Sequence, residues 1–125
     1  MIEYMTHLTP QEEEAMLILW RLGKGFVKDI LELYPQPQPP YTTLASTVKN
    51  LERKGYVESR RYGNTYEYTP VVRDKDYKTQ FMSNFVRDFF YNSYSELVTF
   101  YAREQHISAD ELKEIIRLIE NQETK

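Results

Sequence analysis

The sequence predicts a mainly α-helical protein with one small β-hairpin, divided into two parts. Three observations predict this class. Apolar residues recur at three- and four-residue steps along much of the 125-residue chain, as on one face of a helix. Two short alternating runs flank Gly63-Asn64, which is the pattern of a hairpin with a tight turn. Beyond Val72 the pattern changes to long helices, so we expect one domain over 1–72 and another over 73–125.

The composition excludes several classes of protein. The chain has no cysteine, which excludes disulfide scaffolds, cysteine zinc sites and thiol nucleophiles. The net charge of -3 argues against a broad basic surface. The opening residues lack a cationic segment followed by an apolar one, and no apolar run approaches the roughly 18 residues of a membrane span. We therefore expect a cytoplasmic protein with no insertion into a membrane.

The first helix is predicted to begin after Thr9, which is a suitable N-cap. Pro10 fits the first helical position, Glu12 completes a capping box, and Gly23 and Gly25 end the helix. Its apolar stripe consists of Ala15, Met16, Leu19, Trp20 and Leu22.

A short second helix is predicted by apolar residues at helical spacing, and Pro35 ends it. These apolar residues are Val27, Ile30, Leu31 and Tyr34. The following PQPQPPY segment holds four of the six prolines and predicts a stiff, extended connector. The alternative is a proline-rich ligand for a partner domain, although a structural linker explains the segment without a partner.

The third helix is expected to begin near Thr42 and to end at Gly55. Leu44, Val48 and Leu51 fall on one side of it. The opposite side carries Thr42, Ser46, Lys49 and Arg53, with Thr43 and Asn50 at its flank.

The hairpin arms are predicted at 56–61 and 65–69. Tyr66 and Tyr68 alternate with Thr65 and Glu67, as in a strand with one covered face, and Pro70 ends the second arm.

Long helices are predicted from Arg73 onward. An aromatic ladder at four-residue steps begins the first of them, Asn92-Ser93 breaks it, and Ser108 with Glu111 forms a capping box for the last. The ladder is Tyr77, Phe81, Phe85 and Phe89, widened by Met82, Val86 and Phe90. The next two helices contribute Leu97, Val98, Phe100 and Tyr101, then Leu112, Ile115, Ile116 and Ile119.

Charge is placed unevenly along the chain. Residues 41–72 hold five bases and three acids, whereas the segments before and after hold more acids than bases. A helix with hydroxyl, amide and cationic side chains, followed by a basic hairpin, predicts a winged helix-turn-helix that binds double-stranded DNA. The expected DNA contacts are Thr42, Thr43, Ser46, Lys49, Asn50, Arg53, Arg60, Arg61, Asn64 and Tyr66. A solvated polar helix beside an ordinary hairpin is the alternative for the same residues.

The C-terminal aromatic and aliphatic residues are too numerous for a few helices of one chain to cover. Such a surface indicates an interface, and a homodimer is the commonest kind. We therefore expect a helical dimerisation domain. A hydrophobic ligand pocket and a core within one chain are the alternatives. The expected dimer contacts are Phe81, Phe85, Phe89, Phe90, Leu97, Phe100, Tyr101, Leu112, Ile115, Ile116 and Ile119.

Little in the sequence indicates an enzyme, a metal or a cofactor. His7 and His106 stand alone, without a carboxylate or second histidine at ligand spacing. No glycine-rich phosphate loop or nucleophile elbow is present. The acidic run 12–14 is better explained as a helix N-terminus than as a metal cluster. Apart from a DNA-binding regulator, the sequence leaves open a ligand-sensing winged-helix regulator and a winged-helix module that binds proteins.

Four segments stand in a specific order and spacing: LTPQEEEAMLILW, TTLASTVKNLERKGYV, YEYTP and DKDYKTQFMSNFVRDFFYNSYSELVTFYAREQHISADELKEII. Together they resemble the BlaI/MecI penicillinase-repressor family of bacterial winged-helix regulators. The resemblance runs from Leu8 to Asn121.

The resemblance implies a homodimeric repressor that binds a dyad operator through the third helix and the wing and dimerises through the C-terminal helices. In the well-studied branch, a β-lactam-sensing membrane protein triggers proteolysis within the dimerisation part. The corresponding site lies near Thr99, Phe100 and Tyr101. The connector is more proline-rich than the family pattern. Ala45 and Asn50 stand where the antibiotic-resistance members carry longer or cationic side chains, so we do not expect this chain to share their operator sequence. The cysteine tail of copper-responsive relatives is absent.

Overall fold

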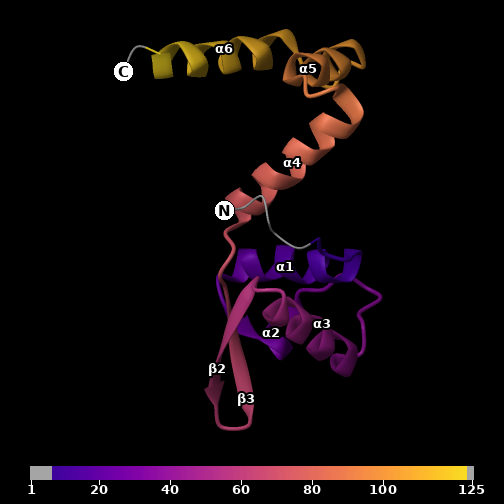
Figure 1. Ribbon diagram of the computed structural model, residues 1–125, viewed down its shortest axis with the longest axis vertical. Helices are drawn as coiled ribbons and strands as arrows, with labels where there is room; N and C mark the ends of the chain where they lie inside the picture. Colours follow the sequence, from indigo (N-terminus) through magenta and orange to yellow (C-terminus); the bar gives the residue numbers. More distant parts are fainter. Residues whose placement is uncertain (1–6, 124–125) are drawn as a thin grey trace. The chain divides into compact units, whose positions relative to one another are not determined.

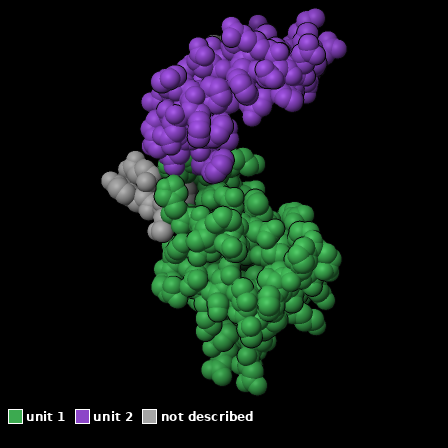
Figure 2. All heavy atoms as spheres, turned by 90° about the vertical axis from the view of Figure 1, so that its right-hand side faces the viewer, with its two compact units in different colours: residues 1–80 green, residues 81–125 purple. Residues whose placement is uncertain are grey.

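The computed structural model describes residues 7–123. It forms two compact units, residues 1–80 and 81–125, shown in different colours in Figure 2. The elements follow the chain as α1 (Pro10–Leu22), β1 (Gly25–Phe26), α2 (Val27–Glu32), α3 (Tyr41–Arg53), β2 (Val57–Tyr62), β3 (Thr65–Pro70), α4 (Asp74–Phe90), α5 (Tyr94–Arg103) and α6 (Ala109–Glu123). Within the described part of the chain, no helix has the length and apolar character that crossing a membrane requires.

The N-terminal unit combines three helices with a small antiparallel sheet in the order β1-β3-β2. The hairpin of β2 and β3 extends away from α1, as Figure 1 shows. Its turn is formed at Gly63-Asn64, where Gly63 has a φ of 61° and adopts the left-handed backbone that glycine tolerates. The predicted hairpin is therefore confirmed, with arms one residue further along the chain at their outer ends.

The two-residue strand β1 is an addition to the predicted fold. Gly25 pairs with Tyr68 and Phe26 with Glu67, so the hairpin becomes a three-stranded sheet. A Cβ at Gly25 would lie 3.3 Å from both Leu22 Cδ1 and Asp29 Cβ, so glycine permits the close approach. Two residues carry no alternating pattern; the sequence places Gly25 at the end of the first helix and predicts no element for Phe26.

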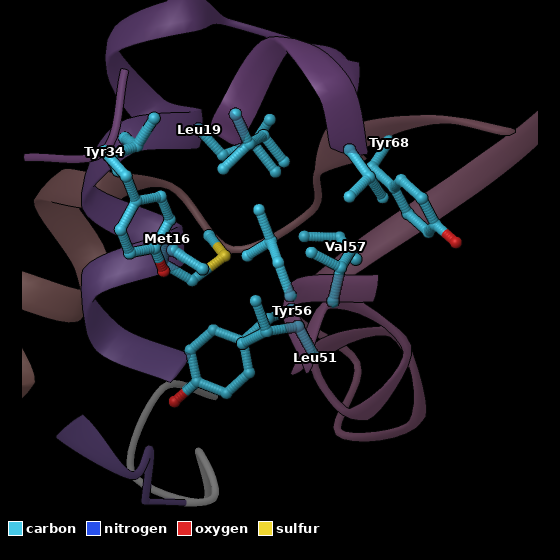
Figure 3. Close-up of a cluster of buried hydrophobic side chains, with 13 residues drawn as sticks. Met16, Leu19, Tyr34, Leu51, Tyr56, Val57 and Tyr68 are labelled. Atoms are coloured by element: carbon cyan, nitrogen blue, oxygen red, sulfur yellow. The ribbon is translucent and has the colours of Figure 1, made fainter. Parts of the chain in front are cut away.

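One apolar core holds the N-terminal unit together. Met16 and Leu19 of α1 pack with Leu51 of α3, with Tyr56 after it, and with Tyr68 of β3 (Figure 3). Each fully buried large apolar side chain stabilises the fold by about 1.5–3 kcal/mol relative to exposure. The other buried members are Ala15, Ile18, Val27, Ile30, Tyr34, Leu44, Val48 and Val57.

The predicted start of α1 and end of α3 are confirmed. The Glu12 backbone N–H donates to Thr9 Oγ1 at 3.2 Å, and the Thr9 N–H donates to Glu12 Oε1 at 2.9 Å. Gly55, with a φ of 85°, ends the α3 segment, and the Tyr56 N–H then donates to the Leu51 carbonyl at 2.9 Å. These hydrogen bonds fix the beginning of α1 and the end of α3.

The C-terminal unit contains the rest of α4 and the helices α5 and α6. Tyr91 and Asn92 have φ values of 52° and 65° and end α4 where the sequence predicts a break. Ser93 caps α5 by accepting from the Glu96 N–H at 3.1 Å, and Ser108 with Glu111 forms the predicted box before α6. Among the described residues of these helices, Val86 alone is classed as buried.

The division between the compact units falls inside α4, between residues 80 and 81, whereas the sequence suggested 72/73. The first turns of α4 group with the N-terminal unit because Tyr77 packs against its core. Whether the units act as a DNA-binding and a dimerisation domain stays a prediction at this point.

Candidate nucleic-acid interface

Helix α3 has one buried and one exposed side. Leu44, Val48 and Leu51 are at most 1% exposed, so they anchor the helix in the core. The opposite side carries the exposed residues Thr42, Thr43, Ser46, Lys49 and Arg53, whereas Asn50 is half-buried at the flank. The sequence predicted this division, and the structure brings the six polar residues together on one surface of one helix.

The hairpin meets α3 through a short polar contact. Ser59 Oγ of β2 donates to Glu52 Oε2 of α3 at 2.6 Å. Tyr68 of β3 is 3% exposed and belongs to the same core as α3. The side of the hairpin that bears Ser59 and Tyr68 therefore faces α3.

The strand register separates the two arginines of the wing. Adjacent residues of a strand point to opposite faces, so Arg60 and Arg61 lie on different sides of the hairpin. Arg61 is paired with Tyr66 and lies on the face of Ser59 and Tyr68, which is the face toward α3. Arg60 is paired with Glu67 on the other face. The sequence treated these arginines as one pair, and the structure makes them unequal.

Both arginines have contacts that restrict them. Arg61 Nε donates to the Gly63 carbonyl at 2.8 Å, which holds the guanidinium near the turn. The Arg60 guanidinium lies 5.4 Å from the centre of the Tyr62 ring, a cation–π distance. Asn64 in the turn and Tyr66 beside it are exposed. The tip thus offers cations, an amide and a phenol, which are groups that bind phosphate and sugar.

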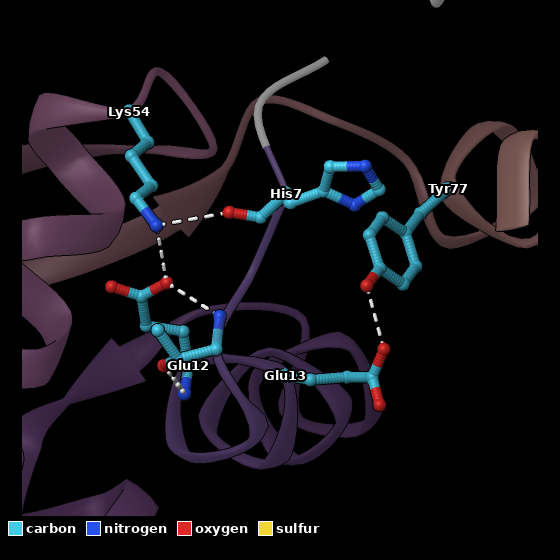
Figure 4. Close-up of polar contacts among 6 residues, drawn as sticks. His7, Glu12, Glu13, Lys54 and Tyr77 are labelled. Atoms are coloured by element: carbon cyan, nitrogen blue, oxygen red, sulfur yellow. Dashed lines mark hydrogen bonds and ion pairs between the residues drawn. The ribbon is translucent and has the colours of Figure 1, made fainter.

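The bases near α3 differ in availability. Lys54, at its C-terminal end, donates to Glu12 Oε1 at 2.6 Å and to the His7 carbonyl at 2.9 Å (Figure 4). Lys49 and Arg53 are exposed and make no side-chain hydrogen bond or ion pair within residues 7–123. Lys54 therefore serves the fold, and Lys49 and Arg53 remain for an anionic partner.

Two of the acids in this segment are also engaged. Glu52 accepts from Ser59, and Glu67 lies 3.9 Å from Lys24 Nζ, the limit of an ion pair. Glu58 on β2 is exposed. Lys24 partly offsets the charge of Glu67, which lies on the hairpin face away from α3. The Ser59 hydroxyl, in contrast, orients the Glu52 carboxylate without neutralising it.

Tyr41 is a candidate contact that the sequence reasoning missed. It is the first residue of α3 and 51% exposed. Its ring lines an open groove of about 760 Å³ with Lys28 and Glu32 of α2 and Thr65 of β3. The signal was available, because Tyr41 follows Pro40 directly and stands at the start of α3.

The buried acid of α1 is structural. Burial raises the pKa of the Glu12 carboxyl, but hydrogen bonds from Lys54 and from the Thr9 N–H and the charge of Lys54 outweigh burial and lower it. In the part of the chain that the structure describes, no group of three or more metal-ligating side chains comes together. His106 stacks edge-on against the Tyr101 ring, with the ring centres 5.9 Å apart.

The residues predicted for dimerisation form an incompletely covered apolar surface in the C-terminal unit. Rings pack on one another, with 5.1 Å between the centres of Phe85 and Phe89 and 5.7 Å between those of Phe90 and Phe100. Much apolar area stays in solvent even so. At least 39% of the side chain is exposed at Phe81, Phe89, Phe100, Tyr101, Ile115, Ile116 and Ile119, whereas Phe85, Phe90, Leu97 and Leu112 are half-buried.

One family model matches nearly the whole described chain. The model described as "Penicillinase repressor" matches residues 8–121, which lie in both compact units. The methicillin resistance regulatory protein MecI of Staphylococcus aureus (strain N315) is 21% identical over 113 residues, covering 90% of this chain and 92% of that protein.

Two further relatives differ in how much of the chain they match. The penicillinase repressor of Bacillus licheniformis is 19% identical over 119 residues, covering 94% of this chain and 93% of that protein. An uncharacterised 16.5 kDa protein of Latilactobacillus sakei is 30% identical over 74 residues, which is 58% of this chain and 50% of that protein.

Proposed function

The chain belongs to the penicillinase repressor family, and we propose that it is a dimeric transcriptional repressor that binds a dyad operator in double-stranded DNA. The observation that carries the proposal is the surface shared by α3 and the α3-facing side of the hairpin. It combines the exposed hydroxyls of Thr42 and Ser46, the cations Lys49 and Arg53, and Arg61 of the wing. The expected place of action is the cytoplasm.

The proposed contacts follow from the dimensions of DNA. An α-helix fits the major groove, where its N-terminal residues reach deepest. Thr42, Thr43 and Ser46 are therefore assigned to the base edges, and Asn50, at the flank, to an adenine at the rim of the contact. Lys49 and Arg53 lie further along the same side and are assigned to phosphates. The wing reaches the neighbouring backbone with Arg61, Tyr66 and Asn64.

The dimer is proposed from the apolar surface of the C-terminal unit. Exposed rings and aliphatic side chains on α4, α5 and α6 leave much apolar area in solvent, and large exposed apolar patches usually mark an interface. A second copy of the chain supplies the same surface and can cover it by two-fold symmetry. Two copies of α3 then read two half-sites. One copy alone would bind one half-site, and with low specificity, because a single small module buries little surface.

Binding is tested directly by mobility shift with the duplex DNA upstream of the protein's own gene. We expect a complex that weakens steeply with salt, because phosphate neutralisation releases counterions, and that survives competition by unrelated duplex. Sedimentation of the free protein should give a dimer. A protein that binds all duplexes equally, or none, contradicts the proposed function.

Sequence reading is tested by substitutions on α3. Ser46→Ala and Asn50→Ala should change the preferred bases, while Lys49→Ala should weaken binding to all sequences alike. Gln11→Ala, an exposed amide on α1, is the matched control and should leave both properties unchanged. Selection from a random duplex library reports the preference, and an unchanged preference for both variants would remove these residues from base recognition.

Derepression is proposed to occur by proteolysis in the C-terminal unit, triggered by a membrane sensor protease, as the family resemblance implies. The expected position near Thr99, Phe100 and Tyr101 lies within α5, where Phe100 is 50% and Tyr101 is 39% exposed. Helical backbone must unwind before a protease can bind it in extended form. Because Phe100 and Tyr101 are among the proposed dimer contacts, cleavage here would also weaken the dimer. Mass analysis of the protein from induced cells tests this: fragments ending outside α5, or intact protein with full derepression, contradict it.

A further inference from the structure

The first turns of α4 are held in the N-terminal unit by a hydrogen bond and by ring contacts of one residue, Tyr77. Tyr77 Oη donates to Glu13 Oε2 of α1 at 2.6 Å (Figure 4). Its ring centre lies 5.5 Å from that of Trp20 and 5.9 Å from that of Tyr56. Trp20 Nε1 in turn donates to the Val72 carbonyl, just before α4, at 2.9 Å. We call these contacts of Tyr77 and Trp20 the α4 clamp.

Tyr56 connects the α4 clamp to α3. This residue follows α3 directly, is 1% exposed, and donates its backbone N–H to the Leu51 carbonyl of α3. Glu12, next to Glu13 in α1, binds Lys54 at the other side of the same helix end. Adjacent carboxylates of α1 thus hold the end of α3 and the beginning of α4 in one network.

The chemistry of the clamp resists local opening. Burial raises the pKa of Tyr77, and so does its hydrogen bond to Glu13, so the hydroxyl stays protonated and remains a donor throughout the physiological range. Tyr77 also bridges two elements that are far apart in sequence, α1 and the segment after α3. The first turn of α4, held by a hydrogen bond and by two rings, therefore has little freedom to pivot against α3.

We propose that Tyr77 is a positioning residue for two-site DNA binding. It fixes the first turn of α4 against α1 and the end of α3, and so it limits the half-site spacings that a dimer can bind. This inference rests on the proposed function, because it needs a dimer that occupies two half-sites. Half-sites of two-fold readers lie about one helical turn of DNA apart, so a shift of about half a turn moves one half-site to the wrong face of the duplex.

The test uses full-length protein and synthetic duplexes. Each duplex carries two copies of the half-site footprinted on the upstream DNA, separated by spacers that increase one base pair at a time, and one duplex carries a single half-site. Tyr77→Phe keeps the rings in contact and removes the hydrogen bond, whereas Tyr77→Ala removes both. Tyr34→Phe, which removes a hydroxyl from a buried tyrosine of the same unit, is the matched control.

The wild type and Tyr34→Phe should prefer one spacing by about tenfold or more over a spacing shifted by half a turn, a discrimination comparable to one good recognition contact. Tyr77→Ala should bind the single half-site and dimerise as the wild type does, yet distinguish the spacings by less than about threefold. Tyr77→Phe should fall between them. If Tyr77→Ala does not fold, Tyr77→Phe combined with Trp20→Phe is read in the same way.

Failures of the two ideas give different results. A wild type that binds the dyad with a narrow spacing preference, which Tyr77→Ala retains, overturns the positioning role and leaves the proposed function standing. A wild type that accepts all spacings equally also overturns it. A wild type that forms no complex with the dyad beyond that with unrelated duplex overturns the proposed function itself.

Discussion

The two compact units use equally amphipathic helices, but they differ in how far they cover their apolar sides. In the N-terminal unit, helices and a sheet enclose a core in which Met16, Leu19 and Leu51 have no exposed surface. In the C-terminal unit, helices of comparable or greater length bury Val86 completely and leave Phe89 69% exposed. Amphipathicity therefore predicts a helix without predicting whether its apolar side is covered by the same chain.

The difference has a structural cause. In the N-terminal unit a small sheet packs with the helices, and Val57 of β2 and Tyr68 of β3 belong to the core. The C-terminal unit has helices and no strand among residues 81–123, and its rings pack on one another, as Phe85 does with Phe90. The N-terminal unit thus encloses its core, while the C-terminal unit leaves apolar side chains in solvent, which supports the proposed dimer interface.

The largest effect should follow from opening the core of the N-terminal unit. Leu51→Ala removes a side chain with no exposed surface from the last turn of α3, where it belongs to the core. The lost burial and the remaining cavity should lower the free energy of unfolding by about 2–5 kcal/mol. Leu17→Ala, at a leucine of α1 that is 52% exposed, should change it by less than about 0.5 kcal/mol. Urea unfolding of both variants measures the contrast, and equal effects would mean that the core is not closed around Leu51.

The next effect concerns the C-terminal unit. Phe89→Ala removes a ring that is mostly in solvent in one chain, so a monomer would tolerate it. In a dimer that buries this ring, the dissociation constant should rise about 30-fold or more, since interface anchors contribute about 2 kcal/mol or more. Leu33→Ala, at a leucine of the N-terminal unit that is 46% exposed, is the control and should leave association unchanged. Sedimentation across a concentration series measures both, and a wild type that stays monomeric would end the contrast between the units.

The sequence predicts elements whose signals are local. Thr9 with Glu12, Gly55, Gly63-Asn64, Asn92-Ser93 and Ser108 with Glu111 all act through neighbours within a few residues, and the structure confirms each boundary. The division of α3 into an apolar and a polar side is equally local, because helical geometry places the residues.

Features that depend on contacts between distant parts of the chain could not be predicted from the sequence. The partner of Lys54 is Glu12, and that of Tyr77 is Glu13, contacts across the fold that no spacing announces. The strand β1 exists only because β3 offers it an edge. The unequal faces of Arg60 and Arg61 follow from the register, which the sequence permits, but the side that faces α3 is set by the burial of Tyr68.

A smaller effect should separate the two arginines without touching the C-terminal unit. Arg61→Ala removes the cation on the α3-facing side of the wing and should weaken DNA binding about tenfold, the value of one charge-assisted contact. It should also reduce the salt slope by about one. Arg60→Ala, on the opposite face, is its matched control and should cost clearly less. Fluorescence anisotropy at several salt concentrations measures both, and equal losses would show that the wing enters DNA edge-on, with both faces in contact.

The smallest effect is a pH dependence confined to the N-terminal unit. Glu12 has a lowered pKa in the folded protein, so its ionised form stabilises the fold at pH values above its ordinary value of 4.5, and this stabilisation is lost as the pH falls through the folded pKa. Glu12→Gln keeps a weaker neutral acceptor for the Thr9 N–H and Lys54, and should reduce the free energy of unfolding by about 1 kcal/mol at pH 7. The difference between wild type and variant should shrink below pH 4.5, as the wild-type carboxyl protonates.

Glu111 on α6 provides the comparison in the other unit. The N–H and hydroxyl of Ser108 lower the pKa of Glu111 too, but this carboxyl is exposed to solvent, so Glu111→Gln should change stability less at every pH. Unfolding curves at pH 7 and at pH 3.5 for both variants decide the matter. A Glu12→Gln deficit that is the same at both pH values would mean that the Glu12 charge contributes nothing, and that Lys54 stabilises the end of α3 through its His7 contact alone.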